Sequence, residues 1–69
     1  MKIFGERIRI LRKEKKLRQE DVAKEIGISF RTYCRYENIE REPTAPTIVA
    51  LADLFGVSAD YLLGRSDER

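Results

Sequence analysis

The stretch Gln19–Asn38, QEDVAKEIGISFRTYCRYEN, contains two short helical patterns joined by a glycine. In the first pattern the apolar residues fall on one face and include Ala23, which is small enough for a crossing helix to approach closely. Gly27 provides the positive φ that ends this helix, and the Ser29 hydroxyl can cap the next one. The stretch therefore predicts two helices joined by a tight turn.

The second of these helices has two unlike sides when its residues are placed at intervals of about 100°. Tyr33 and Tyr36 fall on one side, which we expect to face the core. Two short helices at a steep angle are the unit that places its second helix in the major groove of DNA. The other side is basic and exposed, and it carries Phe30, Arg31, Cys34, Arg35 and Asn38.

The net charge of +2 conceals an uneven distribution along the chain. Residues 1–35 have 11 Lys and Arg against 5 Asp and Glu, a balance of +6, whereas residues 36–69 have 3 against 7, a balance of −4. On its own, a charged run such as Arg12–Lys16 is more simply a solvated helix face. Because the basic half contains the two-helix unit, the distribution favours contact with DNA phosphates.

Composition narrows the remaining classes of protein. A chain of 69 residues forms one domain, near the size at which stability becomes marginal. With one cysteine and no histidine we expect no disulfide framework, metal or cofactor. No paired carboxylates or nucleophile and base can be named, so we expect no enzyme. No signal peptide or membrane-spanning run is visible, which predicts a cytoplasmic protein without membrane contact.

Five segments, in their order and spacing, resemble the lambda-repressor-like helix-turn-helix regulators of the Cro and Xre type. The resemblance covers nearly the whole chain and implies an all-α, compact five-helix DNA-binding domain with a helix-turn-helix in its second and third helices. It also implies a bacterial or phage protein. The segments are FGERIRILR at Phe4–Arg12, QEDVAKEIGIS at Gln19–Ser29, RYEN at Arg35–Asn38, REPT at Arg41–Thr44 and LADLFGVSADYLLG at Leu51–Gly64.

Periodicity and capping signals place the five helices in a domain over residues 1–64, followed by a polar tail over residues 65–69 that we expect to fray. Thr44 and Ser58 cap the fourth and fifth helices, and Pro46 lies in the first turn of the fourth. The expected helices are Ile3–Lys15, Gln19–Ile26, Phe30–Asn38, one that follows Thr44 and ends at Gly56, and one that follows Ser58.

Base contacts are expected from the exposed side of the third helix, where the resemblance assigns them to Phe30, Arg31 and Arg35. An arginine can bind O6 and N7 of guanine in bidentate fashion, which contributes about 1–3 kcal/mol of discrimination. A solvated or phosphate-bound arginine is the simpler alternative. Phe30 stands at the start of a helix with no core to enter, and it can contact a thymine methyl.

Phosphate contacts are expected at the edges of the same unit. In the family, the position of Gln19 contacts a phosphate or supports the first base-contacting residue. Arg18 stands where the family usually has a capping Ser or Thr, and the lack of that cap costs about 1 kcal/mol. The positive end of the helix dipole also repels the arginine. A DNA phosphate at this position would offset both effects. A neutral surface change is the alternative for Arg18, and a bond to the backbone of its own helix is the alternative for Thr32. The predicted phosphate-contacting residues are Lys16, Arg18, Gln19, Ser29, Thr32 and Arg41.

Structural explanations apply to Arg12, Glu37 and Cys34. The resemblance implies an ion pair between Arg12 and Glu37 that fixes the orientation of this helix. Cys34 lies on the DNA-facing side, but no histidine is present to lower the pKa of its thiol. We therefore expect a small side chain there and not a redox sensor.

The loop after the third helix departs from the family pattern. Ile39 and Glu40 stand where the family usually has glycine and a basic residue. This predicts a strained cap at Ile39 and repulsion between Glu40 and phosphate, which leaves Arg41 as the main phosphate ligand of the loop.

A second copy of the chain is the expected partner besides double-stranded DNA. The third helix is about 13 Å long and reaches about four or five base pairs, too few to specify one genomic site. The family dimerises around the start of the fifth helix, and the predicted interface residues are Leu54, Ala59 and Tyr61. Closure of the monomer core is the alternative for Tyr61, and Ile10 and Leu54 are expected at the surface.

The sequence therefore predicts sequence-specific binding of double-stranded DNA by a transcriptional regulator, most simply a homodimeric repressor. A controller of a restriction-modification system or an antitoxin of the same fold is one alternative. A protein-interaction module that does not bind DNA is another, although it has no reason to keep Arg31 and Arg35 exposed.

Overall fold

The computed structural model describes all 69 residues and contains five α-helices and no strand. None of the helices is long and apolar enough to span a bilayer. All five predicted helices are confirmed, and both bounds of the first and the end of the third differ from the predicted ones by one residue. The helices are α1 (Lys2–Glu14), α2 (Gln19–Ile26), α3 (Phe30–Glu37), α4 (Ala45–Phe55) and α5 (Ala59–Leu63).

Side-chain hydroxyls cap the N-termini of three of the helices. Those of Ser29, Thr44 and Ser58 each accept a hydrogen bond from the backbone N–H three residues further on, at 3.1, 3.3 and 3.0 Å. Each bond satisfies an N–H group that has no partner within its own helix. α2 ends at Gly27, whose φ of +76° is in the left-handed region. These predicted capping residues are confirmed.

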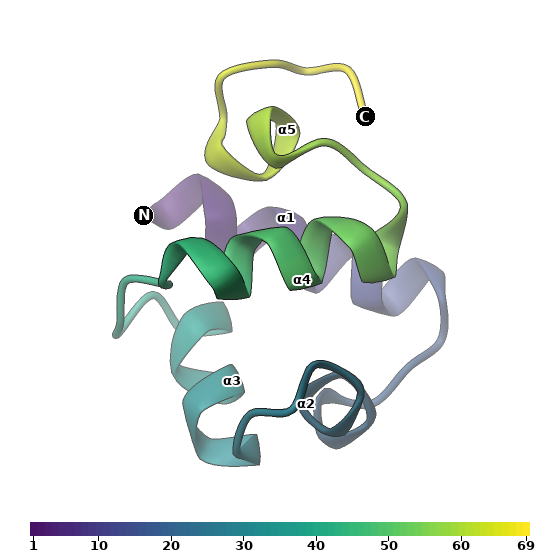
Figure 1. Cartoon of the computed structure of the whole chain (residues 1–69), viewed down its shortest axis with the longest axis vertical. Coiled ribbons are helices and arrows are strands. Elements are labelled where there is room, and N and C mark those ends of the chain that lie inside the picture. Colours follow the sequence, from purple (N-terminus) through teal and green to yellow (C-terminus); the bar gives the residue numbers. More distant parts are fainter.

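The helices pack around one core that all five of them share. In Figure 1, α4 lies in front of α1, with α2 and α3 below this pair and α5 above it. The α2–α3 unit therefore stands at one end of the molecule and the last helix at the other. The buried apolar side chains are Phe4, Ile8, Leu11, Val22, Ala23, Tyr33, Tyr36, Leu51, Ala52, Phe55, Tyr61 and Leu62.

The residue that follows the cap of α3 has the strained backbone that the sequence predicts. Ile39 has a φ of +63°, although its side chain is β-branched. The backbone N–H of Glu40 donates to the carbonyl oxygen of Arg35 at 2.9 Å, which closes the left-handed turn at the end of α3. A glycine would adopt this turn without the steric cost that a Cβ imposes.

The tail over residues 65–69 folds back onto α1, so the prediction that it frays is wrong. The Arg69 guanidinium donates to both carboxylate oxygens of Glu14, at 2.8 and 2.7 Å. The backbone N–H of Ser58 donates to the carbonyl oxygen of Arg69 at 2.8 Å. The tail is therefore attached to α1 and to the turn before α5, through partners that no local sequence pattern indicates.

Arg7 connects α1 to both α5 and the tail. Its guanidinium lies 4.1 Å from the centre of the Tyr61 ring and donates to the carbonyl oxygens of Tyr61 and Ser66 and to the Asp67 carboxylate. A cation over an aromatic face and several satisfied N–H groups make this a strong junction. The residues around Arg7 give no sign of the role, because its partners are 54 or more residues away.

Gly5 lies where α1 approaches the end of α3. A Cβ at this position would lie 2.7 Å from the carbonyl oxygen of Tyr36 and 3.0 Å from Cγ1 of Ile39. The first of these atoms belongs to the backbone, so it cannot move without a shift of α3.

We expect Gly5→Ala to lower the free energy of unfolding by about 1–3 kcal/mol, as overpacking does. The sign is opposite to the helix propensities, which favour alanine over glycine by about 1 kcal/mol. Urea unfolding followed by circular dichroism measures the change. Glu6→Ala, at an exposed position of the same helix, is the control and should change the value by less than about 0.5 kcal/mol. An unchanged or stabilised Gly5→Ala variant would contradict this close approach of α1 and α3.

Candidate nucleic-acid interface

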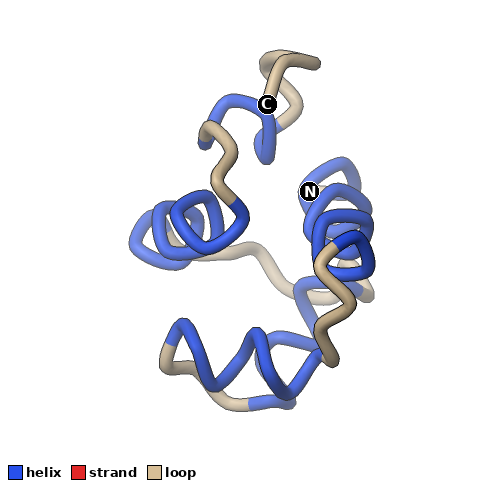
Figure 2. The backbone as a smooth tube through the Cα atoms, turned by 90° about the vertical axis from the view of Figure 1, so that its right-hand side faces the viewer, coloured by secondary structure: helices blue, strands red, loops and turns tan.

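α3 presents one face to the core and the opposite face to solvent. Tyr33 and Tyr36 are buried, whereas Phe30 is 53% exposed. Arg31 is exposed and Arg35 is half-buried. In Figure 2 the two helices of this unit lie together at one end of the molecule, apart from the chain termini. The predicted division of α3 into a core side and a solvent side is confirmed.

The arginines on the solvent side of α3 have no counter-charge within the chain. Of the nine arginines in the sequence, five form salt bridges with carboxylates of the chain. The other four are Arg9, Arg31, Arg35 and Arg41. Three of these four are predicted DNA contacts, and their guanidinium groups are available to an external anion.

A buried carboxylate connects α3 to α1 and α2. The Glu37 side chain is 3% exposed. Arg12 of α1 donates to it through Nε and Nη2, at 2.7 and 3.2 Å, and Gln19 of α2 donates through Nε2 at 3.1 Å. The hydroxyl of Tyr33, one turn earlier in α3, is a further donor. The ion pair between Arg12 and Glu37 that the resemblance implies is therefore present, within a larger network.

These donors decide the charge of Glu37. Burial by itself raises the pKa of this carboxyl, but hydrogen bonds from Arg12, Tyr33 and Gln19 and the charge of Arg12 outweigh that effect, and the pKa of Glu37 is lowered. Burial, followed by the hydrogen bond to Glu37, raises the pKa of Tyr33. Glu37 is therefore ionised at neutral pH, and Tyr33 keeps the proton that it donates.

A comparison with protein families agrees with this geometry. A family model described as helix-turn-helix matches residues 8–62. The chain belongs to the helix-turn-helix family.

Individual proteins with similar sequences or structures show which members of the helix-turn-helix family the chain resembles. The chain is 41% identical over 66 residues to YobD, an uncharacterised HTH-type transcriptional regulator of Bacillus subtilis (strain 168), and the match covers 96% of this chain but 59% of YobD. The chain thus spans about three fifths of the length of that relative. The predicted lambda-repressor-like fold and family are confirmed by two solved structures.

Both structures are of the P22 c2 repressor. The nuclear magnetic resonance structure of its DNA-binding domain has a TM-score of 0.81 at 40% identity, and the match covers 87% of this chain and 79% of that one. The crystal structure of the repressor in complex with synthetic operator 9T also has a TM-score of 0.81, at 39% identity, and the match covers 86% and 89% of the two chains.

Within this helix-turn-helix domain the side chain of Gln19 is bonded to the protein. Its Nε2 faces Glu37, and its Oε1 lies 3.5 Å from the Cys34 thiol. A phosphate contact from this side chain would require both bonds to break, so the free backbone N–H groups at the start of α2 are the better donors.

Arg18 has its counter-charges within the chain. Its guanidinium pairs with Glu20 at 3.2 Å and with Asp21 at 3.1 Å. The Asp21 carboxylate also accepts a hydrogen bond from the backbone N–H of Arg18 at 2.8 Å, and its pKa is lowered by these bonds from Arg18. Because a guanidinium has no acceptor, only this half of a capping box can form. The charge of Arg18 near the start of α2 is thus compensated without DNA.

The other predicted phosphate ligands differ in whether their side chains are already bonded within the chain. The side chains of Lys16 and Arg41 are exposed and have no partner within the chain. The Ser29 hydroxyl accepts a bond from the backbone N–H of Thr32 and donates to the Thr32 hydroxyl at 2.8 Å. The Thr32 hydroxyl is therefore bonded to the capping side chain, and not to the backbone of its own helix.

The predicted dimer-interface residues are covered to different extents. Tyr61 is 8% exposed and belongs to the core, with the guanidinium groups of Arg7 and Arg69 over its ring. Closure of the monomer core, the alternative for Tyr61, is therefore present. Ala59 and Leu54 are half-buried.

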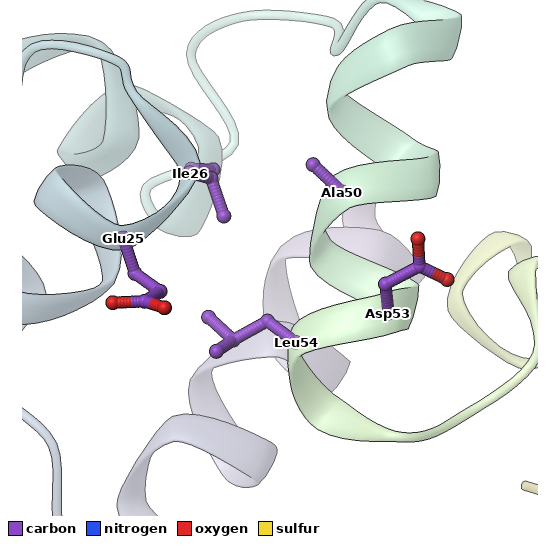
Figure 3. A pocket seen from close by; sticks show the side chains of 5 residues that line it. All are labelled: Glu25, Ile26, Ala50, Asp53 and Leu54. Atoms are coloured by element: carbon purple, nitrogen blue, oxygen red, sulfur yellow. The ribbon is translucent and has the colours of Figure 1, made fainter.

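Leu54 also lines an open hollow between α2 and α4 (Figure 3). Ile26 and Ala50 complete its apolar wall, and Glu25 and Asp53 stand at its edge. Its volume is about 400 Å³. The hollow contains none of the predicted DNA contacts, so it is not part of the candidate interface.

The hydroxyl of Tyr33 is a functional group that the helical wheel conceals. The wheel places Tyr33 in the core, which is correct for its ring, but the hydroxyl binds Glu37. The spacing of four residues between Tyr33 and Glu37 is the signal that could have indicated this contact, because such residues are neighbours on a helix.

We expect Glu37→Gln to lower the free energy of unfolding at pH 7 by about 3 kcal/mol, because an amide cannot accept all the donors that surround this site and the Arg12 charge is left unpaired. Since the pKa of Glu37 is lowered by folding, the advantage of the wild type is fully present above the ordinary glutamate pKa of about 4.3. It should shrink as pH falls from there through the folded value.

Urea unfolding of the wild type and Glu37→Gln at pH 7 and pH 3 measures this difference. Glu6→Gln, at an exposed position of α1, is the control and should show no such change. A difference between wild type and Glu37→Gln that is equally large at both pH values would mean that the Glu37 charge is not what stabilises the network.

Proposed function

We propose that the chain binds double-stranded DNA in a sequence-specific manner, with α3 in the major groove, as the DNA-binding part of a transcriptional repressor. The observation that carries the proposal is the outer face of α3, where Arg31 and Arg35 have no partner within the chain. The major groove admits an α-helix and displays a distinct pattern of donors and acceptors for each base pair. The similarity to the P22 c2 repressor, whose crystal structure contains a synthetic operator, supports this use of the helix.

Base contacts come from three residues in this proposal. Arg31 and Arg35 lie one turn apart on α3, and each guanidinium can donate two hydrogen bonds to a guanine. Phe30 is exposed at the first position of the helix, where it can pack against a thymine methyl. The buried network around Glu37 fixes the helix, so these side chains are presented from a rigid support.

Phosphate contacts come first from the side chains that are free. Lys16 and Arg41 can bind phosphates without the loss of an existing bond. Arg18 must exchange Glu20 and Asp21 for a phosphate, so its net contribution should be smaller than theirs. Further donors are the backbone N–H groups at the start of α2, which are preferred to the side chain of Gln19, and those beside Ser29 and Thr32.

Arg31→Ala should weaken binding to the preferred sequence by about 1–3 kcal/mol and leave binding to a scrambled duplex nearly unchanged. Arg41→Ala should weaken both duplexes alike, because a phosphate contact carries no sequence information. The preferred sequence is first selected from a random duplex library, and affinities are then measured by fluorescence anisotropy at one salt concentration.

Arg9→Ala is the matched control, because Arg9 is also unpaired but lies on α1. Full selectivity in Arg31→Ala would contradict the role of α3. If the wild type enriched no sequence at all, the chain would instead fit a protein-interaction module of the same fold.

Two copies of the chain bind the operator in this proposal. α3 has eight residues and is about 12 Å long, so one copy contacts too few base pairs for a specific site. A two-fold dimer places two such helices about 34 Å apart on one face of the duplex. The candidate contact region is the start of α5 around Ala59, together with Leu54. Tyr61 supports this region from beneath, since little of it is exposed.

Ala59→Asp should reduce dimerisation while the fold is retained, because an acidic residue in the first turn of α5 complements the helix dipole. Two aspartates would then face each other across the two-fold axis. Sedimentation and titration with full-site and half-site duplexes measure the effect, and the preference for full sites should fall. Ala45→Asp makes the same substitution at the first position of α4 and should leave the oligomeric state unchanged. A wild type that is monomeric on both duplexes, with no preference for full sites, would refute the dimer.

A further inference from the structure

The Gln19 side-chain amide joins two residues of α3 that lie one turn apart. Its Nε2 is 3.1 Å from Oε1 of Glu37, and its Oε1 is 3.5 Å from Sγ of Cys34. A rotation of the amide by 180° would exchange its nitrogen and oxygen. A carboxylate can only accept hydrogen bonds, so only the nitrogen can face Glu37. The oxygen must therefore face Cys34.

Cys34 is consequently the donor of its contact with Gln19. The amide oxygen has no other hydrogen-bonding partner in the chain. A thiol is a weak donor, and it can act here only while protonated, since a thiolate would repel the amide oxygen. Burial, followed by the nearby charge of Glu37, raises the pKa of the Cys34 thiol. The proton is thus retained at neutral pH.

We propose that Cys34 is a positioning residue for DNA recognition: its thiol fixes the Gln19 amide, and the amide holds α3 at one rotation about its own axis against α2. The inference rests on the proposed function, because it concerns how Arg31 and Arg35 are aimed. The Cα atoms of a helix lie about 2.3 Å from its axis and a guanidinium several Å further out, so a rotation of 10° moves it by about 1.5 Å. Such a displacement is enough to spoil a bidentate contact with guanine.

The test is a double-mutant cycle with Cys34→Ala, Gln19→Ala and the double variant, and the readout is the ratio of affinities for the selected and scrambled duplexes. Cys34→Ala should lower this ratio by about 3- to 10-fold, with the scrambled duplex bound as before. In the Gln19→Ala background the same substitution should change the ratio by less than about 2-fold, because the thiol acts through the amide. Cys34→Ser keeps a donor and should recover most of the wild-type ratio.

Two results would overturn the inference. A Cys34→Ala variant that is as selective as the wild type would show that the thiol has no positioning role. Losses that multiply in the double variant would show that Cys34 acts independently of the Gln19 amide. Thermal unfolding shows whether each variant is folded.

A DNA-free readout separates this inference from the proposed function. In nuclear magnetic resonance spectra the side-chain NH₂ signals of Gln19 should shift and move closer together in Cys34→Ala, and less so in Cys34→Ser. Unchanged signals in Cys34→Ala overturn the inference even if DNA binding is established. If the wild type selects no DNA sequence but the signals shift as expected, the proposed function fails while the role of Cys34 in holding the amide stands.

Discussion

The buried charge of Glu37 is the constraint on which the helix-turn-helix depends. A carboxylate removed from water requires donors from the protein. Here the donors come from α1, α2 and α3, so its solvation is complete only when these three helices are in their native positions. Tyr33 and Glu37 are on the same helix, but Arg12 and Gln19 are not. The orientation of α3 is thus fixed by a polar network in addition to apolar packing.

Local signals predict the helices because their causes are local. The hydroxyls of Ser29, Thr44 and Ser58 bind N–H groups three residues further on, and Gly27 ends α2 by its own backbone conformation. The strained φ of Ile39 also follows from what a left-handed turn requires. Each of these features depends on a few consecutive residues, so a single sequence contains the information needed.

Partners distant in the sequence were not predictable in this way. Arg7 meets Asp67 across 60 positions, and Arg69 meets Glu14 across 55, so the tail that composition predicts to fray is ordered. Arg18 is a different case. Its phosphate contact stays a prediction, but Glu20 and Asp21, which stand next to it in the sequence, already compensate its charge within the chain. For Gln19 the family pattern indicates the position but not which bonds its amide already makes.

The distribution of paired and free arginines follows from the different demands of folding and binding. Arg7, Arg12 and Arg69 hold separated segments of the chain together. Their charges are compensated internally, so they add little to the attraction of DNA. Arg31 and Arg35 extend from a helix that is already held in place and remain uncompensated, which keeps their donors free for an external acceptor. The same residue type thus fixes the support in one part of the domain and is available to the ligand in another, and what separates the two uses is whether a carboxylate or carbonyl oxygen of the chain lies within reach.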